Sequence, residues 1–245
     1  MDSSLNLMFW NCRSLYNKLA FFKVNLYAKR PHLVCLTETW LKDSRLPSFI
    51  NYRLFYENRV GNIGGGLAIL VRNDVICQQK PLNLYPDGKL EIQGITILSG
   101  NKNLDIINLY NPSENISSQE FSHYMNQLSN FAIFLGDFNT HHNLWTDKQN
   151  SNTTGQNLVE SLFQYEDLVL LTPFNLPTCY NSISHSYSTL DLIFVTQNLV
   201  NMSGIYLGQN MGSDHEPICA KIAFKPEIFK CKKRQKWIYD FGTWS

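Results

Sequence analysis

The stretch Ile133-Phe134-Leu135-Gly136-Asp137-Phe138-Asn139 decides how this chain is interpreted. An apolar run leads directly to an aspartate and, two residues later, to an asparagine. Short apolar runs of this kind are typical of buried strands, so we expect a core strand that brings Asp137 and Asn139 to a sheet edge. Alternate residues of a strand point the same way, which allows both side chains to share one face. Taken alone, the pattern is equally typical of an Asx turn.

Polar residues lie at the ends of several other apolar runs. They are Asn11 after 5–10, Glu38 after 32–36, Tyr110 at the end of 104–110, and Asp191 in the run 188–195, and a final loop carries Ser213, Asp214 and His215. Layered α/β folds place their sites at such positions, so the series predicts one composite site.

Helical spacing of apolar residues predicts three helices, and shorter runs predict further strands. The helices are expected from Arg13 to about Lys29, from Ser117 to about Leu128 and from Gly155 to Tyr165, and the remaining strands at 67–71, 75–79, 90–98, 168–171 and 219–224. The Gly64-Gly65-Gly66 turn lacks the Gly-Lys-Ser/Thr of a phosphate-binding P-loop and is interpreted as a flexible turn.

The polar series, in this order, resembles the endonuclease/exonuclease/phosphatase family, which includes deoxyribonuclease I and the apurinic endonucleases. The stretches Glu38-Thr39-Trp40, Gly64–Ile69 and His141–Trp145 are similar to the N-terminal endonuclease of non-LTR retrotransposon polyproteins. The resemblance covers the chain from about Leu5 to Ile222. It implies a four-layered α/β sandwich, in which two mixed β-sheets pack face to face and helices lie outside.

The resemblance also implies roles for the polar series. His215 is implied as the general base or phosphate-polarising group, Asp191 as the carboxylate that orients it, and Asp137 as the group that positions or deprotonates the attacking water. Asn139 and Tyr110 are implied to hold the phosphate, and Asn11 is implied to assist beside the metal or the phosphate. Both His215 and Asp137 remain candidates for the general base.

Glu38 and Asp214 are the implied metal ligands. Mg²⁺ prefers a few carboxylates and keeps its waters, so Mg²⁺ is the expected ion, with Mn²⁺ as the alternative. Arg13 stands where the apurinic endonucleases carry a further aspartate, and we assign it no metal role. Adjacent His141 and His142 point apart on a strand and lack a third zinc ligand, which favours a structural or DNA-facing loop.

A polar loop between Pro173 and Ser188 corresponds to a variable hairpin near the DNA groove of related endonucleases. We therefore expect it to influence the choice of target. The candidate DNA contacts in this loop and around the site are Arg13, Asn181, His185, Tyr187, Ser188 and Ser213.

Composition is consistent with one large domain, because 245 residues that are 44% hydrophobic can bury a full core. No signal peptide or membrane-spanning run is recognisable, so we expect an intracellular protein with no membrane partner. The resemblance to retrotransposon endonucleases implies that it acts in the nucleus. The six cysteines are scattered, which favours reduced thiols. The oligomeric state is left open.

The net charge of +1 is unevenly distributed. Residues 225–236 carry six basic residues and one acidic residue, and the chain before them is slightly acidic. We predict an endonuclease domain at 1–224 and a basic linker at 225–245 toward a downstream reverse transcriptase. Because bulk charge is small, DNA affinity must come from local patches and a bound cation.

The predicted function is a Mg²⁺-dependent endonuclease that nicks double-stranded DNA and leaves a 3′-hydroxyl to prime reverse transcription. One alternative is a phosphodiesterase or phosphatase of the same fold acting on inositol phosphates, sphingomyelin or RNA. The other is an inactive DNA-binding module, which would have lost a principal site residue. None of the principal residues is lost.

Overall fold

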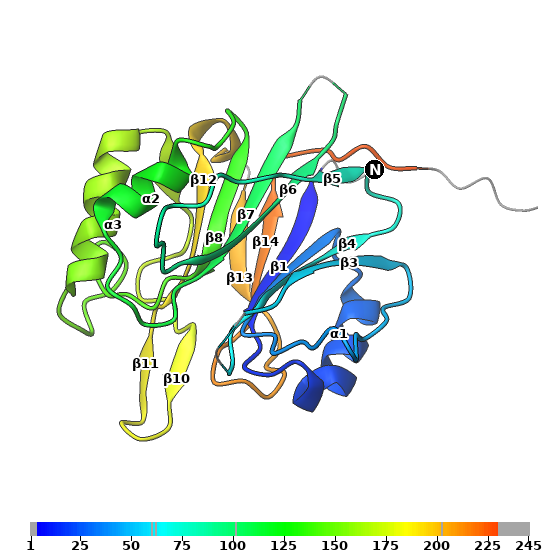
Figure 1. Cartoon of the computed structure of the whole chain (residues 1–245), viewed down its shortest axis with the longest axis horizontal. Helices are drawn as coiled ribbons and strands as arrows, with labels where there is room; N and C mark the ends of the chain where they lie inside the picture. Colours follow the sequence, from blue (N-terminus) through cyan, green and yellow to red (C-terminus); the bar gives the residue numbers. More distant parts are fainter. Residues whose placement is uncertain (1–3, 60, 62, 101, 202, 230–245) are drawn as a thin grey trace, which may run out of the picture.

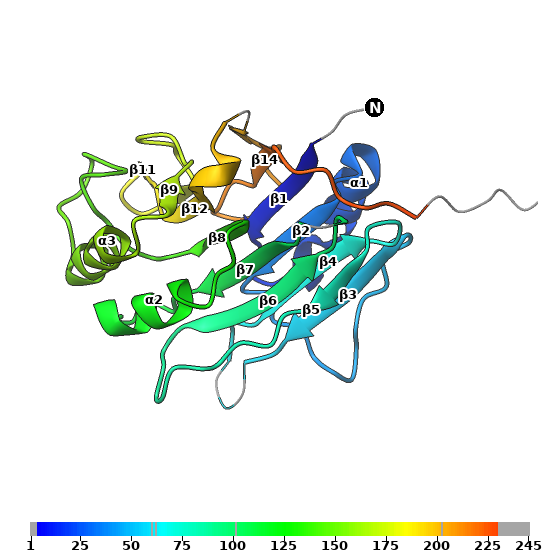
Figure 2. The same cartoon turned by 90° about the horizontal axis from the view of Figure 1, so that it is seen from above.

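The computed structural model describes residues 4–229 except 60, 62, 101 and 202. Two six-stranded sheets pack face to face, and helices lie on their outer faces (Figure 1). Seen from above, the sheets form the two inner layers of the molecule (Figure 2). The predicted four-layered sandwich of two mixed sheets is therefore confirmed.

The first sheet has the strand order β13-β14-β1-β2-β4-β3. Its strands are β1 (Leu5–Asn11), β2 (Leu33–Thr37), β3 (Tyr52–Glu57), β4 (Leu67–Arg72), β13 (Gly204–Leu207) and β14 (Ile218–Ile222). Strands β1 and β2 are parallel, with Asn11 opposite Thr37. Because Glu38 directly follows Thr37, Asn11 and Glu38 emerge at the same edge of the sheet.

The second sheet has the order β5-β6-β7-β8-β12-β9. Its strands are β5 (Cys77–Gln79), β6 (Glu91–Ile97), β7 (Leu104–Tyr110), β8 (Ala132–Asp137), β9 (Leu168–Leu170) and β12 (Asp191–Thr196). Tyr110 lies opposite Asp137 in the parallel β7–β8 pair, and Asp137 lies opposite Asp191 in the antiparallel β8–β12 pair. The register therefore puts these three residues in one row.

Alternating side chains divide the core into layers. Phe9 belongs to the apolar cluster between the sheets, whereas its neighbour Trp10 faces outward and stacks on Phe22 of α1 (Leu19–Lys29) at 5.9 Å between ring centroids. Helices α2 (Ser118–Met125) and α3 (Thr153–Tyr165) cover the outer face of the second sheet (Figure 1). Both faces of the central strands are thereby buried.

The first helix begins later than predicted. Arg13 and Ser14 have φ angles of 38° and 76°, and the Ser14 amide donates to Glu38 O at 2.9 Å. This segment stays beside the end of β2, so a 3-10 turn (Tyr16–Lys18) and α1 follow only afterwards. Edge strands β3 and β13 were not predicted, because their partly exposed faces lack a continuous apolar run.

Residues 225–229 contact the domain. The Ile76 amide donates to Glu227 O at 3.2 Å, and the Phe229 amide donates to Asp74 O at 2.8 Å. Residues 230–245 lie outside the described residues, so the linker stays a prediction. No helix in the described part of the chain has the length and apolar character needed to span a bilayer.

Candidate active site

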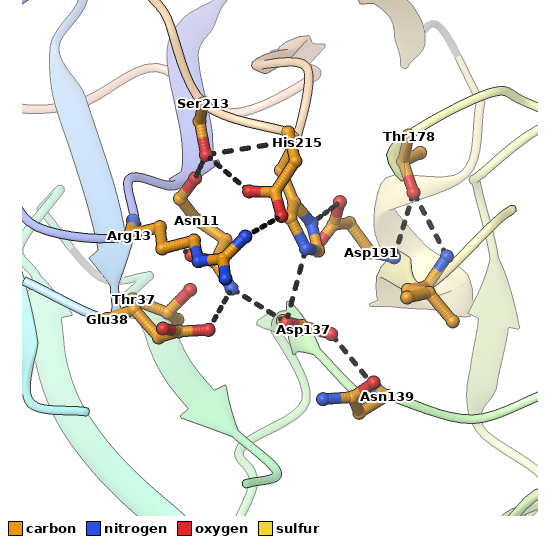
Figure 3. A network of polar contacts seen from close by, with 12 residues as sticks. Asn11, Arg13, Thr37, Glu38, Asp137, Asn139, Thr178, Asp191, Ser213 and His215 are labelled. Atoms are coloured by element: carbon orange, nitrogen blue, oxygen red, sulfur yellow. Dashed lines mark hydrogen bonds and ion pairs between the residues drawn. The ribbon is translucent and has the colours of Figure 1, made fainter. Parts of the chain in front are cut away.

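A buried His–Asp pair lies at the centre of the site (Figure 3). His215 Nδ1 donates to Asp191 Oδ2 at 2.8 Å, and the two residues are 7% and 0% exposed. Burial alone would lower the pKa of His215, but the carboxylates of Asp191 and Asp137 raise it well above its ordinary value. The imidazole is therefore held in one orientation and favours the protonated form.

Asp137 faces the other nitrogen of the imidazole. Its Oδ2 lies 3.9 Å from His215 Nε2 and accepts from Asn11 Nδ2 at 2.8 Å, while its Oδ1 accepts from the Asn139 amide at 3.0 Å. Burial raises the pKa of Asp137 to about 7, against the lowering effect of His215. A carboxylate with this pKa can accept a proton near neutral pH.

Asn11 joins the two sheets at the mouth of the site. Its Nδ2 donates both to Asp137 Oδ2 and to Glu38 Oε1, the latter at 3.0 Å. Its backbone carbonyl accepts from Ser213 Oγ at 2.9 Å. One amide thus fixes the carboxylates of Glu38 and Asp137 beside each other (Figure 3).

Asp214 lies on the same rim and is paired with Arg13. Arg13 Nη1 contacts Asp214 Oδ2 at 2.6 Å, and the side chains are 60% and 31% exposed. Ser213 Oγ contacts Asp214 Oδ1 at 3.2 Å. Partial burial would raise the pKa of Asp214, but the charges of His215 and Arg13 lower it below its ordinary value. The Arg13 guanidinium therefore compensates the negative charge of Asp214, one of the two predicted metal ligands.

Tyr110 and Asn139 flank the carboxylates. Tyr110 is 7% exposed, and burial, followed by the charges of Glu38 and Asp137, raises its pKa, so its hydroxyl keeps a proton to donate. Asn139 lies just beyond β8 with a φ of 48°, and its Nδ2 donates to Asn111 O at 3.3 Å. The chain therefore turns at Asn139 instead of continuing the strand alternation expected from the sequence.

The donor set fits a small hard cation. Glu38 and Asp137 accept from the same Asn11 amide at 3.0 and 2.8 Å, and carboxylate oxygens of this kind suit Mg²⁺. Among the described residues, the one group of three acidic or histidine side chains whose ligand atoms lie close enough together to hold a metal ion is Asp137, Asp191 and His215. Its hydrogen bonds favour a proton relay instead, because Asp191 already holds His215 Nδ1.

The predicted DNA-contacting loop forms the hairpin of β10 (Cys179–Asn181) and β11 (Ser186–Ser188), which extends away from the sheets (Figure 1). Tyr180 and Tyr187 pack at 4.9 Å between ring centroids, and the Tyr180 hydroxyl lies 3.0 Å from His185 Nδ1. Asn181 Oδ1 accepts the amides of residues 183 and 184, so it shapes the turn. Ser188 is buried at the hairpin base and contacts Gln149 Nε2 at 3.1 Å.

Sequence reasoning missed Thr178. Its Oγ1 accepts the backbone amides of Leu190 and Asp191 at 3.0 and 3.1 Å, which fixes the start of β12 and hence the carboxylate that holds His215. A threonine in a polar loop carries no signal of this contact. The contact between Thr178 and the start of β12 spans 12 and 13 residues, so it is recognised only in the folded structure.

Part of this chain matches a known family model, and one curated protein is similar to most of it. Residues 104–219 match a family model described as endonuclease-reverse transcriptase. A Drosophila melanogaster protein named as a probable RNA-directed DNA polymerase from transposon BS is 24% identical over 223 residues, which cover 89% of this chain and 24% of that protein. The chain thus spans about a quarter of that relative's length.

Solved structures share the fold. The endonuclease domain of TRAS1, a telomere-specific non-LTR retrotransposon, matches with a TM-score of 0.74 and 18% identity over 89% of this chain and 98% of that one. The AP endonuclease of Archaeoglobus fulgidus matches with a TM-score of 0.65 and 17% identity over 88% and 98%.

Over residues 104–219 the chain is similar to the endonuclease-reverse transcriptase family, and its fold is that of the solved endonuclease structures. Its similarity to a transposon polymerase and to the endonuclease domain of a non-LTR retrotransposon agrees with the resemblance predicted from the sequence. The individual roles of the site residues remain predictions.

Proposed function

We propose that this chain is a Mg²⁺-dependent endonuclease that nicks double-stranded DNA and leaves a 3′-hydroxyl. The observation that carries the proposal is the relay in which Asp191 holds His215 at 2.8 Å and His215 faces Asp137 at 3.9 Å. Phosphodiester hydrolysis needs a proton acceptor for water and positive charge near the phosphoryl oxygens. The relay supplies both within one buried site.

The two sides of the relay have complementary tasks. Asp137, whose pKa burial raises to about 7, is suited to accept the proton of the attacking water. His215, which Asp191 and Asp137 favour in its protonated form, is suited to donate a hydrogen bond to a phosphoryl oxygen. Tyr110, whose hydroxyl keeps its proton, and Asn139 are the proposed contacts to further oxygens of the same phosphate.

Glu38 and Asp214 are the residues that would hold Mg²⁺. A bound divalent ion would supply charge to the phosphoryl oxygens and to the leaving alkoxide. Asn11 orients Glu38 through its hydrogen bond at 3.0 Å, and Arg13 must release Asp214 for that carboxylate to serve. Mn²⁺ presents a similar preference for carboxylate oxygens and is the alternative ion.

The retrotransposon context extends the proposal. The relatives named for a transposon and for a telomere-specific retrotransposon support a domain that works within a longer protein. We infer that a reverse transcriptase follows in the same polypeptide, that the 3′-hydroxyl primes it, and that the domain acts on chromosomal DNA in the nucleus.

Nicking of supercoiled plasmid tests this function. The purified chain is expected to convert plasmid to open circles with Mg²⁺ and not with a chelator, and a DNA polymerase is expected to extend the nicks directly, because they carry 3′-hydroxyls. Ends that need phosphatase treatment before extension would contradict the proposed product. Hydrolysis of RNA or an inositol phosphate, with the plasmid left closed, would support the other substrate class.

A further inference from the structure

A groove of about 540 Å³ adjoins the site on the side of Glu38. Trp40, two residues beyond Glu38, forms part of its wall, and both residues have positive φ angles of 52° and 50°. The chain therefore turns at the end of β2 and leads directly from the predicted metal ligand into the groove. Arg59 and Lys42 also line it.

Arg59 is fixed between the groove and Tyr110. Its guanidinium lies over the Tyr110 ring at 5.5 Å from the centroid, and its Nε is ion-paired with Glu91 Oε1. The other Glu91 oxygen accepts the Gly66 amide at 2.7 Å. Both charged side chains are only 19% exposed, and Glu91 lies opposite Tyr110 in the β6–β7 register. The cation is therefore held beside a residue expected to contact phosphate.

The glycine turn is needed for this arrangement. Gly64, Gly65 and Gly66 have φ angles of 90°, 65° and 83°. A Cβ at Gly65 would overlap the Arg59 guanidinium, with the nearest atoms at 2.4 Å. Glycine permits both the backbone conformation and the close approach, so the turn has a structural role next to the site.

Two donors in this wall lack acceptors. Arg59 Nη2 and Trp40 Nε1 are buried and have no hydrogen-bond partner within the described part of the chain. Asn58 Oδ1, on the same groove, also lacks a partner. Buried polar groups are rarely left unpaired in native proteins, so an acceptor-bearing ligand accounts for the two donors. A water molecule or the amino group of a nucleobase would donate a hydrogen bond to Asn58 Oδ1.

We propose that Arg59, Trp40 and Lys42 form a subsite for the phosphate group next to the scissile one in the DNA strand. This rests on the proposed endonuclease function. Guanidinium N–H groups match phosphate oxygens in geometry as well as charge. Glu91 uses one edge of the guanidinium and holds it in place, and Nη2 remains for the ligand. The subsite orients the strand and does not take part in the chemistry.

Kinetics of an oligonucleotide duplex with one mapped cut site test the subsite. Arg59→Gln is expected to raise the half-saturating DNA concentration about 10-fold, as for a lost hydrogen bond to a charged group, with turnover changed less than about 3-fold. Lys102→Gln is the matched control, because Lys102 Nζ also lies over a ring, that of Phe131 at 5.0 Å. Melting temperatures verify that each variant folds. Trp40→Phe tests the second donor, because it removes the indole Nε1 and keeps an aromatic ring.

Neutral methylphosphonates, introduced one at a time on either side of the cut, identify the phosphate. At one position the methylphosphonate is expected to weaken DNA binding by the wild type as much as the Arg59→Gln substitution weakens binding of unmodified DNA. The two effects are expected not to add, because the modification and the substitution remove the same contact. Additive effects at every position would overturn the subsite while leaving the endonuclease intact.

Anisotropy of the labelled duplex in chelator separates the two proposals. Binding that depends on Arg59 without cleavage under any metal condition would sustain the subsite and refute the endonuclease. Binding that is equal for wild type and Arg59→Gln would refute the subsite. A chain that neither binds nor cleaves DNA would refute both.

Discussion

At the scale of single residues, Arg13 has the clearest consequence for metal binding. It pairs with Asp214 at 2.6 Å, although Asp214 is a predicted metal ligand. Arg13→Gln is therefore expected to lower the Mg²⁺ concentration that gives half-maximal nicking, by up to about five-fold, since an exposed ion pair contributes about 1 kcal/mol or less. Arg30→Gln, at the exposed end of α1, is the control. An unchanged Mg²⁺ requirement would contradict competition between Arg13 and the ion for Asp214.

His215 should couple the stability of the metal-free protein to pH. Its folded-state pKa is raised above the unfolded value, so its stabilisation is fully present below about pH 6.5 and is lost as the pH rises through the raised pKa. Chemical unfolding in chelator is expected to show the free energy of wild type falling relative to His215→Asn as the pH increases. A difference that grows in favour of wild type at alkaline pH would contradict the ionised pair.

At the scale of elements, the β7–β8 pair depends on Gly136. This residue lies opposite Leu109, and a Cβ there would meet Leu109 O at 2.0 Å. Gly136→Ala is expected to reduce the free energy of unfolding in urea by about 3 kcal/mol or more. Gly204→Ala, which would meet nothing within 4 Å on β13, should change it by less than about 0.5 kcal/mol. Equal effects would mean that the strands can separate at little cost.

The β10–β11 hairpin should affect where DNA is cut more than how fast. Tyr187 is 43% exposed and packs on Tyr180, outside the buried relay. Tyr187→Ala is expected to redistribute mapped nick sites while total nicking stays within about 3-fold, because base stacking on aromatic rings positions a strand. Tyr206→Ala, 55% exposed on β13, is the control. An unchanged cut-site distribution would argue against target reading by this hairpin.

The elements that could be predicted from sequence are those with continuous apolar runs. β8 and β12 are buried on both faces, so Asp137 could be placed at a strand end and Asp191 within the strand expected at 188–195, although β12 itself begins at Asp191. The start of α1 could not, because positive φ angles at Arg13 and Ser14 depend on contacts with the end of β2. Arg59 was missed because its pairing with Glu91 spans 32 residues and leaves no local pattern.

At the scale of the whole molecule, the site exists because two sheets meet. Asn11 and Glu38 come from the first sheet, and Asp137 and Asp191 come from the second. His215 reaches them from the loop before β14, which pairs with β1. The carboxylates of these acidic residues would repel one another without the Asn11 amide, His215 and a cation. The same contacts therefore hold the two sheets together and arrange the side chains for catalysis.

The rate at which His215→Ala nicks plasmid in Mg²⁺ tests the central claim most directly, with Asp191→Asn beside it. Both variants are expected to fold and to lose about 10²- to 10⁴-fold in single-turnover rate, because the first removes the imidazole and the second removes the carboxylate that orients it. A folded His215→Ala protein that nicks DNA at the wild-type rate would contradict the relay.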